Sequence, residues 1–239
     1  MLRYDSFLKH GGGAAPGGDP YWANVIFLAS WDGADAATAF TDESTDARAI
    51  TFVADAQLDT AQKTLGYGAS LLLDGTGDYV SLADDDPLSV DTGDFTFEGF
   101  FRPHEGGRQQ ALMNKRDSSS AEEFSLNLNT DRTLTFLLFR AGAATLTLNG
   151  TTALTLDTWY HIAVGRTGAT SYLFAGGNLE ASGDQANTPT VNTAPFKFGY
   201  DGYNSARAFN GWIQETRLTK GANRYTAGFT APSSPFPRS

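Results

Sequence analysis

Hydrophobic and polar residues alternate in short runs through most of the chain, which is typical of antiparallel strands with one buried face. The alternation is clear in residues 95–101, 124–129 and 134–138. Segments with helical periodicity are short, and residues 84–89 and 121–124 could each form one turn. At least ten short strands separated by polar turns predict an all-β fold, a two-sheet antiparallel jelly-roll sandwich.

Glycine-rich turns between the hydrophobic runs predict how neighbouring strands connect. Residues 74–78 carry two glycines between the apolar runs 71–73 and 79–82, which predicts a hairpin. The dipeptide 149–150 (Asn-Gly) favours a tight turn beside a second pair of strands.

The first 19 residues differ in pattern from the rest. Residues 1–10 are mildly apolar, and residues 11–19 (GGGAAPGGD) have the composition of a flexible linker. One interpretation is a frayed terminus; the other is a docking arm that anchors the chain to a partner through Tyr4, Phe7 and Leu8. We therefore divide the chain into an arm, residues 1–19, and one domain, residues 20–239. The domain ends in a Pro-rich segment that we expect to lie extended over the sandwich.

Composition narrows the class of partner. The 239 residues are 41% hydrophobic and 13% aromatic, enough for a substantial core. The net charge of −10 and the scattered basic residues argue against nucleic acid, which needs a basic face. The absence of cysteine excludes disulfides, thiolate zinc sites and cysteine nucleophiles. No apolar run approaches the ~20 residues of a membrane span, and residues 1–9 lack a signal-peptide pattern. We expect no membrane insertion.

Several phrases together resemble one known family. They are residues 19–22 (DPYW), 31–33 (WDG), 40–44 (FTDES), 212–221 (WIQETRLTKG) and 220–226 (KGANRYT). In this order they resemble the laminin-G-like, concanavalin A-like jelly rolls that bacteriophage structural genes carry, over residues 19–236. The resemblance implies a non-enzymatic protein of the virion surface, released from the host by lysis. Its arm would bind other virion proteins of the capsid or tail, and its domain would bind host-surface or environmental glycans.

The resemblance leaves two other matters open. A purely structural decoration or assembly protein without sugar binding is the alternative function, and a homo-oligomer is compatible with either. Family members often hold one Ca²⁺ at a loop rim through oxygen ligands. The candidate ligands here are Asp32, Asp42, Asp74, Asp78 and Glu215. Relatives often read Ile-Asp-Glu in the last strand, where this chain has Gln214. The alternative is that these acids cap turns.

Catalytic motifs are missing from the sequence. Glycosidases of this fold need two carboxylates across a cleft, and no Glu-x-Asp-x-x-Glu pattern occurs. Glu98 stands alone among aromatic residues, so we expect it to face solvent or to pair with an arginine. The acids of residues 122–123 fall on opposite faces of a strand. His161 is expected to be a packed histidine of a strand. We therefore predict that the protein is not an enzyme.

One loop combines the residue types that bind sugars. Aromatic rings stack on sugar faces, and carboxylates, amides and guanidinium groups bond hydroxyls. Tyr200, Asp201, Tyr203, Asn204 and Arg207 offer all of these in eight residues held by a glycine. The alternative is a plain connecting loop. The four tryptophans border strands, so we expect them to serve in packing.

Overall fold

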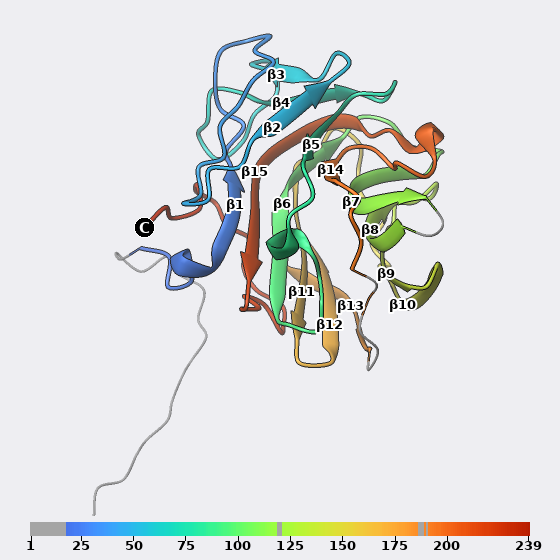
Figure 1. The fold of residues 1–239 in the computed structure, drawn as a ribbon. Coiled ribbons are helices and arrows are strands. Elements are labelled where there is room, and N and C mark those ends of the chain that lie inside the picture. The colour runs from blue at the N-terminus through green and yellow to red at the C-terminus, as the bar shows by residue number, and fades with distance from the viewer. Residues whose placement is uncertain (1–17, 119–120, 186–188, 190) are drawn as a thin grey trace, which may run out of the picture.

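The computed structural model describes residues 18–118, 121–185, 189 and 191–239, and shows two antiparallel sheets packed face to face (Figure 1). One sheet has the order β13-β12-β11-β6-β15-β4-β3, and β1 also pairs with β15. Its strands are β1 (Val25–Ala29), β3 (Gln57–Asp59), β4 (Ser70–Asp74), β6 (Phe95–Pro103), β11 (Tyr160–Thr167), β12 (Thr170–Ala175), β13 (Asn178–Asp184) and β15 (Asn210–Lys220). We call it the eight-stranded sheet.

The second sheet, the seven-stranded sheet, has the order β10-β9-β8-β7-β14-β5-β2. Its strands are β2 (Ile50–Val53), β5 (Tyr79–Leu82), β7 (Gln110–Ser118), β8 (Ala121–Leu128), β9 (Leu134–Arg140), β10 (Ala143–Asn149) and β14 (Phe196–Phe198). In the described residues the helical turns are η1 (Trp22–Asn24), η2 (Asp86–Leu88) and η3 (Ser205–Arg207). None of the described helices has the length and apolarity to cross a membrane. The predicted all-β jelly-roll sandwich is confirmed.

Two local predictions from the sequence are wrong. The segment 75–78 does not close a hairpin: β4 belongs to the eight-stranded sheet and β5 to the seven-stranded sheet, so the chain crosses between the sheets there. Gly75 and Gly77 both have positive φ, which permits the sharp change of direction. Residues 121–124 begin β8 instead of forming a helical turn. The pair of strands expected before residues 149–150 is formed by β9 and β10, which pair antiparallel.

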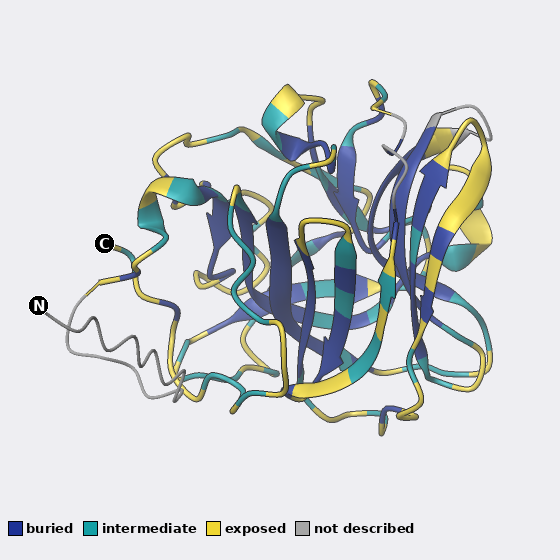
Figure 2. Ribbon diagram, turned by 90° about the horizontal axis from the view of Figure 1, so that it is seen from below, coloured by how far each residue is buried: buried dark blue, intermediate teal, exposed yellow. Residues whose placement is uncertain are grey.

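The core lies between the sheets and is rich in aromatic rings. Phe97 of the eight-stranded sheet contacts Phe124 and Phe196 of the other, with ring centroids 5.0 and 5.8 Å apart. Trp31 is fully buried among Phe27, Phe40, Phe52 and Phe198, as expected for a packing tryptophan. Buried residues run along both sheets, whereas exposed residues lie in the loops and on the edge strands β10 and β13 (Figure 2).

The outer face of the eight-stranded sheet is covered as well. Residues 221–239, which we call the C-terminal strap, lie across it after β15 (Figure 1). Phe236 of the strap packs with Val25, Leu28 and Phe100 in a small second core, and the strap contains no strand or helix. The prediction of an extended Pro-rich segment over the sandwich is confirmed. Because both of its faces are covered, β6 is buried along nearly its whole length.

Candidate functional site

The loop of residues 200–207, between β14 and β15, is closed by a buried carboxylate. Asp201 has no exposed surface. Its Oδ1 accepts the backbone N–H of Tyr203 at 2.9 Å, and its Oδ2 accepts Nη1 of Arg207 at 2.9 Å and Nη1 of Arg116 at 3.3 Å. Asn204 caps η3 by accepting the backbone N–H of Ala206 at 3.1 Å. These bonds fix the shape of the loop, so its side chains are pre-positioned.

Tyr203 is the exposed aromatic ring of this loop. About half of it, 52%, is open to solvent. The guanidinium carbon of Arg116 lies 4.4 Å from the Tyr203 ring centroid and 5.2 Å from that of Phe139. A cation held between two rings attracts both. Arg116 also pairs with Glu122 of β8. Tyr203 is therefore supported by the seven-stranded sheet and can present an exposed surface to a ligand.

The start of the loop rests on the same sheet. Tyr200 stacks on Tyr79 with centroids 4.7 Å apart and planes at 20°. Its carbonyl accepts the side-chain amide of Asn114 at 2.5 Å. Burial is the main cause that raises the pKa of Tyr79 above its usual value, and the nearby Tyr200 and Asp117 raise it further. A Cβ on Gly202 would clash with Asp117 and with the carbonyl of Arg116, so glycine lets the loop lie close to β7.

The structure thus brings the five residues of the predicted sugar-binding loop onto one support. It adds Arg116 and Asp117 of β7, together with Tyr79 and Lys197, which sequence reasoning missed. Lys197 lies on β14, directly before the loop, whereas β7 and β5 are far from the loop in the sequence. Only the pairing of β7 and β5 with β14 brings them together.

Two of the buried predicted calcium ligands, Asp42 and Glu215, are saturated with protein donors. Asp42 accepts the backbone N–H groups of Leu28, Ser44 and Arg48 at 2.9–3.0 Å and the hydroxyl of Ser44 at 2.9 Å. Glu215 accepts the backbone N–H of Phe236 at 2.5 Å, the hydroxyl of Tyr67 at 2.6 Å and Arg238 at 3.0 and 3.1 Å. Glu215 thereby holds the C-terminal strap to the sheet.

The other three acids cap loops, which agrees with the alternative interpretation of their role. Asp78 accepts the backbone N–H groups of Asp55 and Asp74 at 2.7 and 3.1 Å. Asp74 accepts that of Thr76 at 2.6 Å, and Asp32 accepts those of Gly68 and Ala69 at 2.8 and 3.0 Å. Across the described parts of the chain, no group of three or more histidine, aspartate or glutamate side chains could hold a metal ion.

Glu98 is the centre of a buried charge network. Its Oε1 accepts Nε and Nη2 of Arg217 at 2.9 and 2.7 Å, and its Oε2 lies 3.1 Å from Nε2 of His161 and 2.9 Å from the hydroxyl of Tyr225. Asp19 completes the network by binding Arg217 at 3.0 Å and Arg224 at 2.7 and 2.9 Å. The arginine partner that the sequence predicts for Glu98 is confirmed, and His161 is packed as expected.

Two opposing effects act on the acidity of Glu98. Burial raises its pKa, but the charge of Arg217 and the hydrogen bond from His161 outweigh burial and hold the pKa below its usual range. Glu98 is therefore an ionised structural carboxylate, closed off from any substrate.

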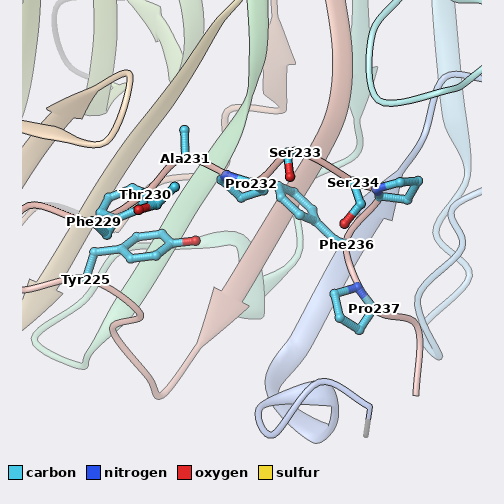
Figure 3. A pocket seen from close by; sticks show the side chains of 10 residues that line it. Tyr225, Phe229, Thr230, Ala231, Pro232, Ser233, Ser234, Phe236 and Pro237 are labelled. Atoms are coloured by element: carbon cyan, nitrogen blue, oxygen red, sulfur yellow. The ribbon is translucent and has the colours of Figure 1, made fainter. Parts of the chain in front are cut away.

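The C-terminal strap forms a surface pocket of about 390 Å³ (Figure 3). Tyr225 and Phe229 lie at one end, Pro232 and Ser233 lie between them and Phe236, and Ser234 and Pro237 lie at the other end. The rings of Tyr225 and Phe229 stack on each other at 3.7 Å, and the Tyr225 hydroxyl is bonded to Glu98. The pocket therefore offers chiefly serine and threonine hydroxyls for polar recognition, whereas the 200–207 loop also offers the amide of Asn204.

Comparison with known proteins places this fold in a family. Residues 74–223 match the family model Laminin_G_3, described as the concanavalin A-like lectin/glucanases superfamily. No curated protein sequence matches the chain.

Three solved structures illustrate the likeness of fold. The binding domain of Paraclostridial Mosquitocidal Protein 1 is 14% identical, with a TM-score of 0.67 over 85% of this chain and 50% of that chain. Domain 4 of AbnA, a GH43 extracellular arabinanase from Geobacillus stearothermophilus, solved with arabinotriose, is 16% identical, with a TM-score of 0.60 over 83% and 93%. The botulinum neurotoxin serotype D ligand binding domain, solved with N-acetylneuraminic acid, is 12% identical, with a TM-score of 0.64 over 85% and 49%. The chain spans about half the length of the two toxin domains.

Proposed function

Because the chain belongs to the concanavalin A-like lectin/glucanase superfamily, we propose that it is a non-enzymatic glycan-binding module whose ligand rests on the 200–207 loop. The observation that carries this proposal is the Tyr203 ring, 52% exposed and held by Arg116. An aromatic ring fixed in place can stack on a sugar at little cost in conformational entropy. Two neighbours of similar fold were solved with an oligosaccharide and with a sialic acid, which supports sugar as the ligand class.

The placement of the acids supports a binding role over hydrolysis. A glycosidase needs two carboxylates that reach the substrate about 5 to 9 Å apart. Glu98 is enclosed by its four donors. Glu122 is buried and paired with Arg116, and Glu123 is buried beside Lys115 at 3.3 Å. Each of these glutamates has a structural partner, and none is free to transfer a proton to a leaving group.

The biological setting that we propose is the surface of a bacteriophage virion. The resemblance of the sequence to phage laminin-G-like proteins supports it. In this proposal residues 1–19 anchor the protein to capsid or tail proteins through Tyr4, Phe7 and Leu8, which lie outside the described residues. Deleting residues 1–18, which keeps Asp19 in its buried network with Arg217 and Arg224, should abolish association with particles while glycan binding persists. Particle association that survives the deletion would contradict the docking role.

Calcium at a loop rim also stays a prediction of the resemblance. Adding Ca²⁺ to chelator-treated protein should raise the melting temperature if the native state binds the ion. A melting temperature that is the same in Ca²⁺ and in chelator would remove the metal from the proposal.

The direct test of glycan binding uses the full-length protein on a glycan panel and on host envelopes. Tyr203→Ala should weaken binding about tenfold or more, equivalent to at least about 1.4 kcal/mol, because the stacking surface is lost. Tyr203→Phe keeps the ring and should bind nearly as well. Leu179→Ala removes another exposed apolar side chain, on β13 of the other sheet, and is the control.

The outcomes separate the candidate functions. Unchanged binding by Tyr203→Ala would refute the loop as the site and direct attention to the strap pocket. An absence of saturable glycan binding by the wild type would favour the alternative, a structural decoration protein.

A further inference from the structure

Every cation that supports the 200–207 loop is matched by an acid. Arg116 pairs with Glu122 and with Asp201 at 3.3 Å, and Arg207 pairs with Asp201 at 2.9 Å. Lys197 pairs with Asp117. Arg108, which donates to the carbonyls of Ala206 and Ala208 beneath η3, pairs with Glu105 at 3.0 Å. Around this loop, in the part of the chain that the structure describes, these four cations and four carboxylates therefore cancel.

Arg116, one of the two buried cations of this set, is also closed to an anionic ligand. One terminal nitrogen of Arg116 pairs with Asp201 and the other pairs with Glu122. The rings of Tyr203 and Phe139 lie against its guanidinium group. Its Nε has no hydrogen-bond partner but is buried. A ligand carboxylate would have to displace a protein carboxylate to reach Arg116, which would leave a buried charge unpaired. The net charge of −10 adds a long-range repulsion against anions.

Most of the groups that the loop exposes are uncharged. Tyr203 and Ser205 are exposed, and Asn204 is partly exposed. Arg207 is also partly exposed, at 27%, but its charge is neutralised by Asp201 at 2.9 Å. A ring, a hydroxyl and an amide match the C–H face and the hydroxyl groups of a neutral sugar. Resting on the proposed function, we infer that the 200–207 loop selects neutral glycans and discriminates against sialylated, uronic-acid and sulfated ones.

The test compares matched pairs of glycans that share a core and differ only in one acidic sugar or sulfate. The wild type should bind the neutral member at least tenfold more tightly. Its affinity for that member should change less than twofold between 50 and 500 mM NaCl, because screening weakens only charge-based attraction. Tighter binding of the acidic member would overturn the inference and leave the proposed function intact. Failure to bind either glycan of the pair would contradict both the inference and the proposed function.

A charge variant tests the pairing argument itself. Asp117→Asn removes the carboxylate, 44% exposed, that neutralises Lys197. Because Lys197 is itself buried, circular dichroism at the assay temperature must first show that the variant is folded. The ratio of acidic to neutral affinity should rise several-fold. Asp157→Asn is the matched control, since Asp157 is equally exposed at 49% but pairs with Arg102 beside the eight-stranded sheet. It should leave the ratio unchanged. An unchanged ratio in Asp117→Asn, or an equal rise in both variants, would overturn the inference.

Discussion

Replacing Glu98 with glutamine should destabilise the protein strongly, because Glu98 is the buried partner of a buried arginine. The substitution keeps the shape and removes the charge. Arg217, whose side chain is 4% exposed, then keeps only Asp19 as an anionic partner, and Asp19 is already bound by Arg224. Breaking a buried ion pair by removing one partner costs about 3–5 kcal/mol, because the other charge stays buried without its counter-ion.

This loss of free energy translates into a measurable shift. For a chain of this size, each 1 kcal/mol changes the melting temperature by about 2–4 °C, so Glu98→Gln should melt about 6–20 °C lower. Urea denaturation followed by circular dichroism measures the free energy of unfolding directly. Asp131→Asn, which removes a fully exposed carboxylate, is the control and should leave the free energy of unfolding nearly unchanged. A loss below about 1 kcal/mol in Glu98→Gln would refute the reasoning.

The second charge of the pair provides a double-mutant cycle. Arg217 lies 4.0 Å from the ring centroid of Phe236, so methionine at position 217 can keep an apolar contact. Glu98→Gln with Arg217→Met removes both charges together. The double variant should lose clearly less free energy than the sum of the two single variants, because each single variant leaves one buried charge without its partner and the double variant removes both charges. Additive losses would show that packing, and not charge pairing, explains the effect of Glu98.

Three further predictions concern the same scaffold. The difference in stability between wild type and Glu98→Gln should be constant above pH 4.5 and should shrink at lower pH. The reason is that the fold holds the pKa of Glu98 below its ordinary 4.5, so its stabilising contribution is lost as the pH falls and the carboxylate is protonated. Urea titrations at several pH values measure this difference. Phe236→Ala should cost about 3–5 kcal/mol in urea and make the C-terminal strap sensitive to limited proteolysis, since the ring fills the second core. Asp42→Ala leaves three backbone N–H groups without their acceptor, and should cost about 3 kcal/mol in thermal unfolding.

The strands could be predicted because their signal is local. The alternation in residues 95–101 and 134–138 is a property of each segment, and both became strands. Which strand pairs with which is not a local property. Residues 71–73 and 79–82 look like the two arms of a hairpin, yet β4 pairs with β15 and β5 pairs with β14. The choice depends on partners more than 100 residues away, which a reading of one segment cannot include.

The candidate site divides in the same way. The loop of residues 200–207 was visible because five suitable side chains fall within eight residues. Its supports were not visible, because Arg116 reaches Tyr203 only through the pairing of β7 with β14. The predicted calcium ligands show the opposite error, because their residue types suggested a metal site where the fold uses the carboxylates to bind its own donors. Glu215 has the chemistry of a calcium ligand, but a bulge in β15 with φ of 51° places it against Arg238 and the strap.

The two sheets leave unequal room for a ligand, and this asymmetry follows from the charges. On the outer face of the eight-stranded sheet, Glu98 and Arg217 are opposite each other on paired strands, and such charges are costly to bury unless all their bonds are satisfied. The strap binds Glu98 with Tyr225 and Arg224 and places the Phe236 ring against Arg217, and Glu215 in turn binds Arg238. That face is therefore occupied by the chain itself. At the seven-stranded sheet, Asp201 and Arg116 satisfy each other within the loop and its support, so Tyr203 stays uncovered. We consequently expect the glycan to bind at the seven-stranded sheet, where the buried charges are paired without the C-terminal strap.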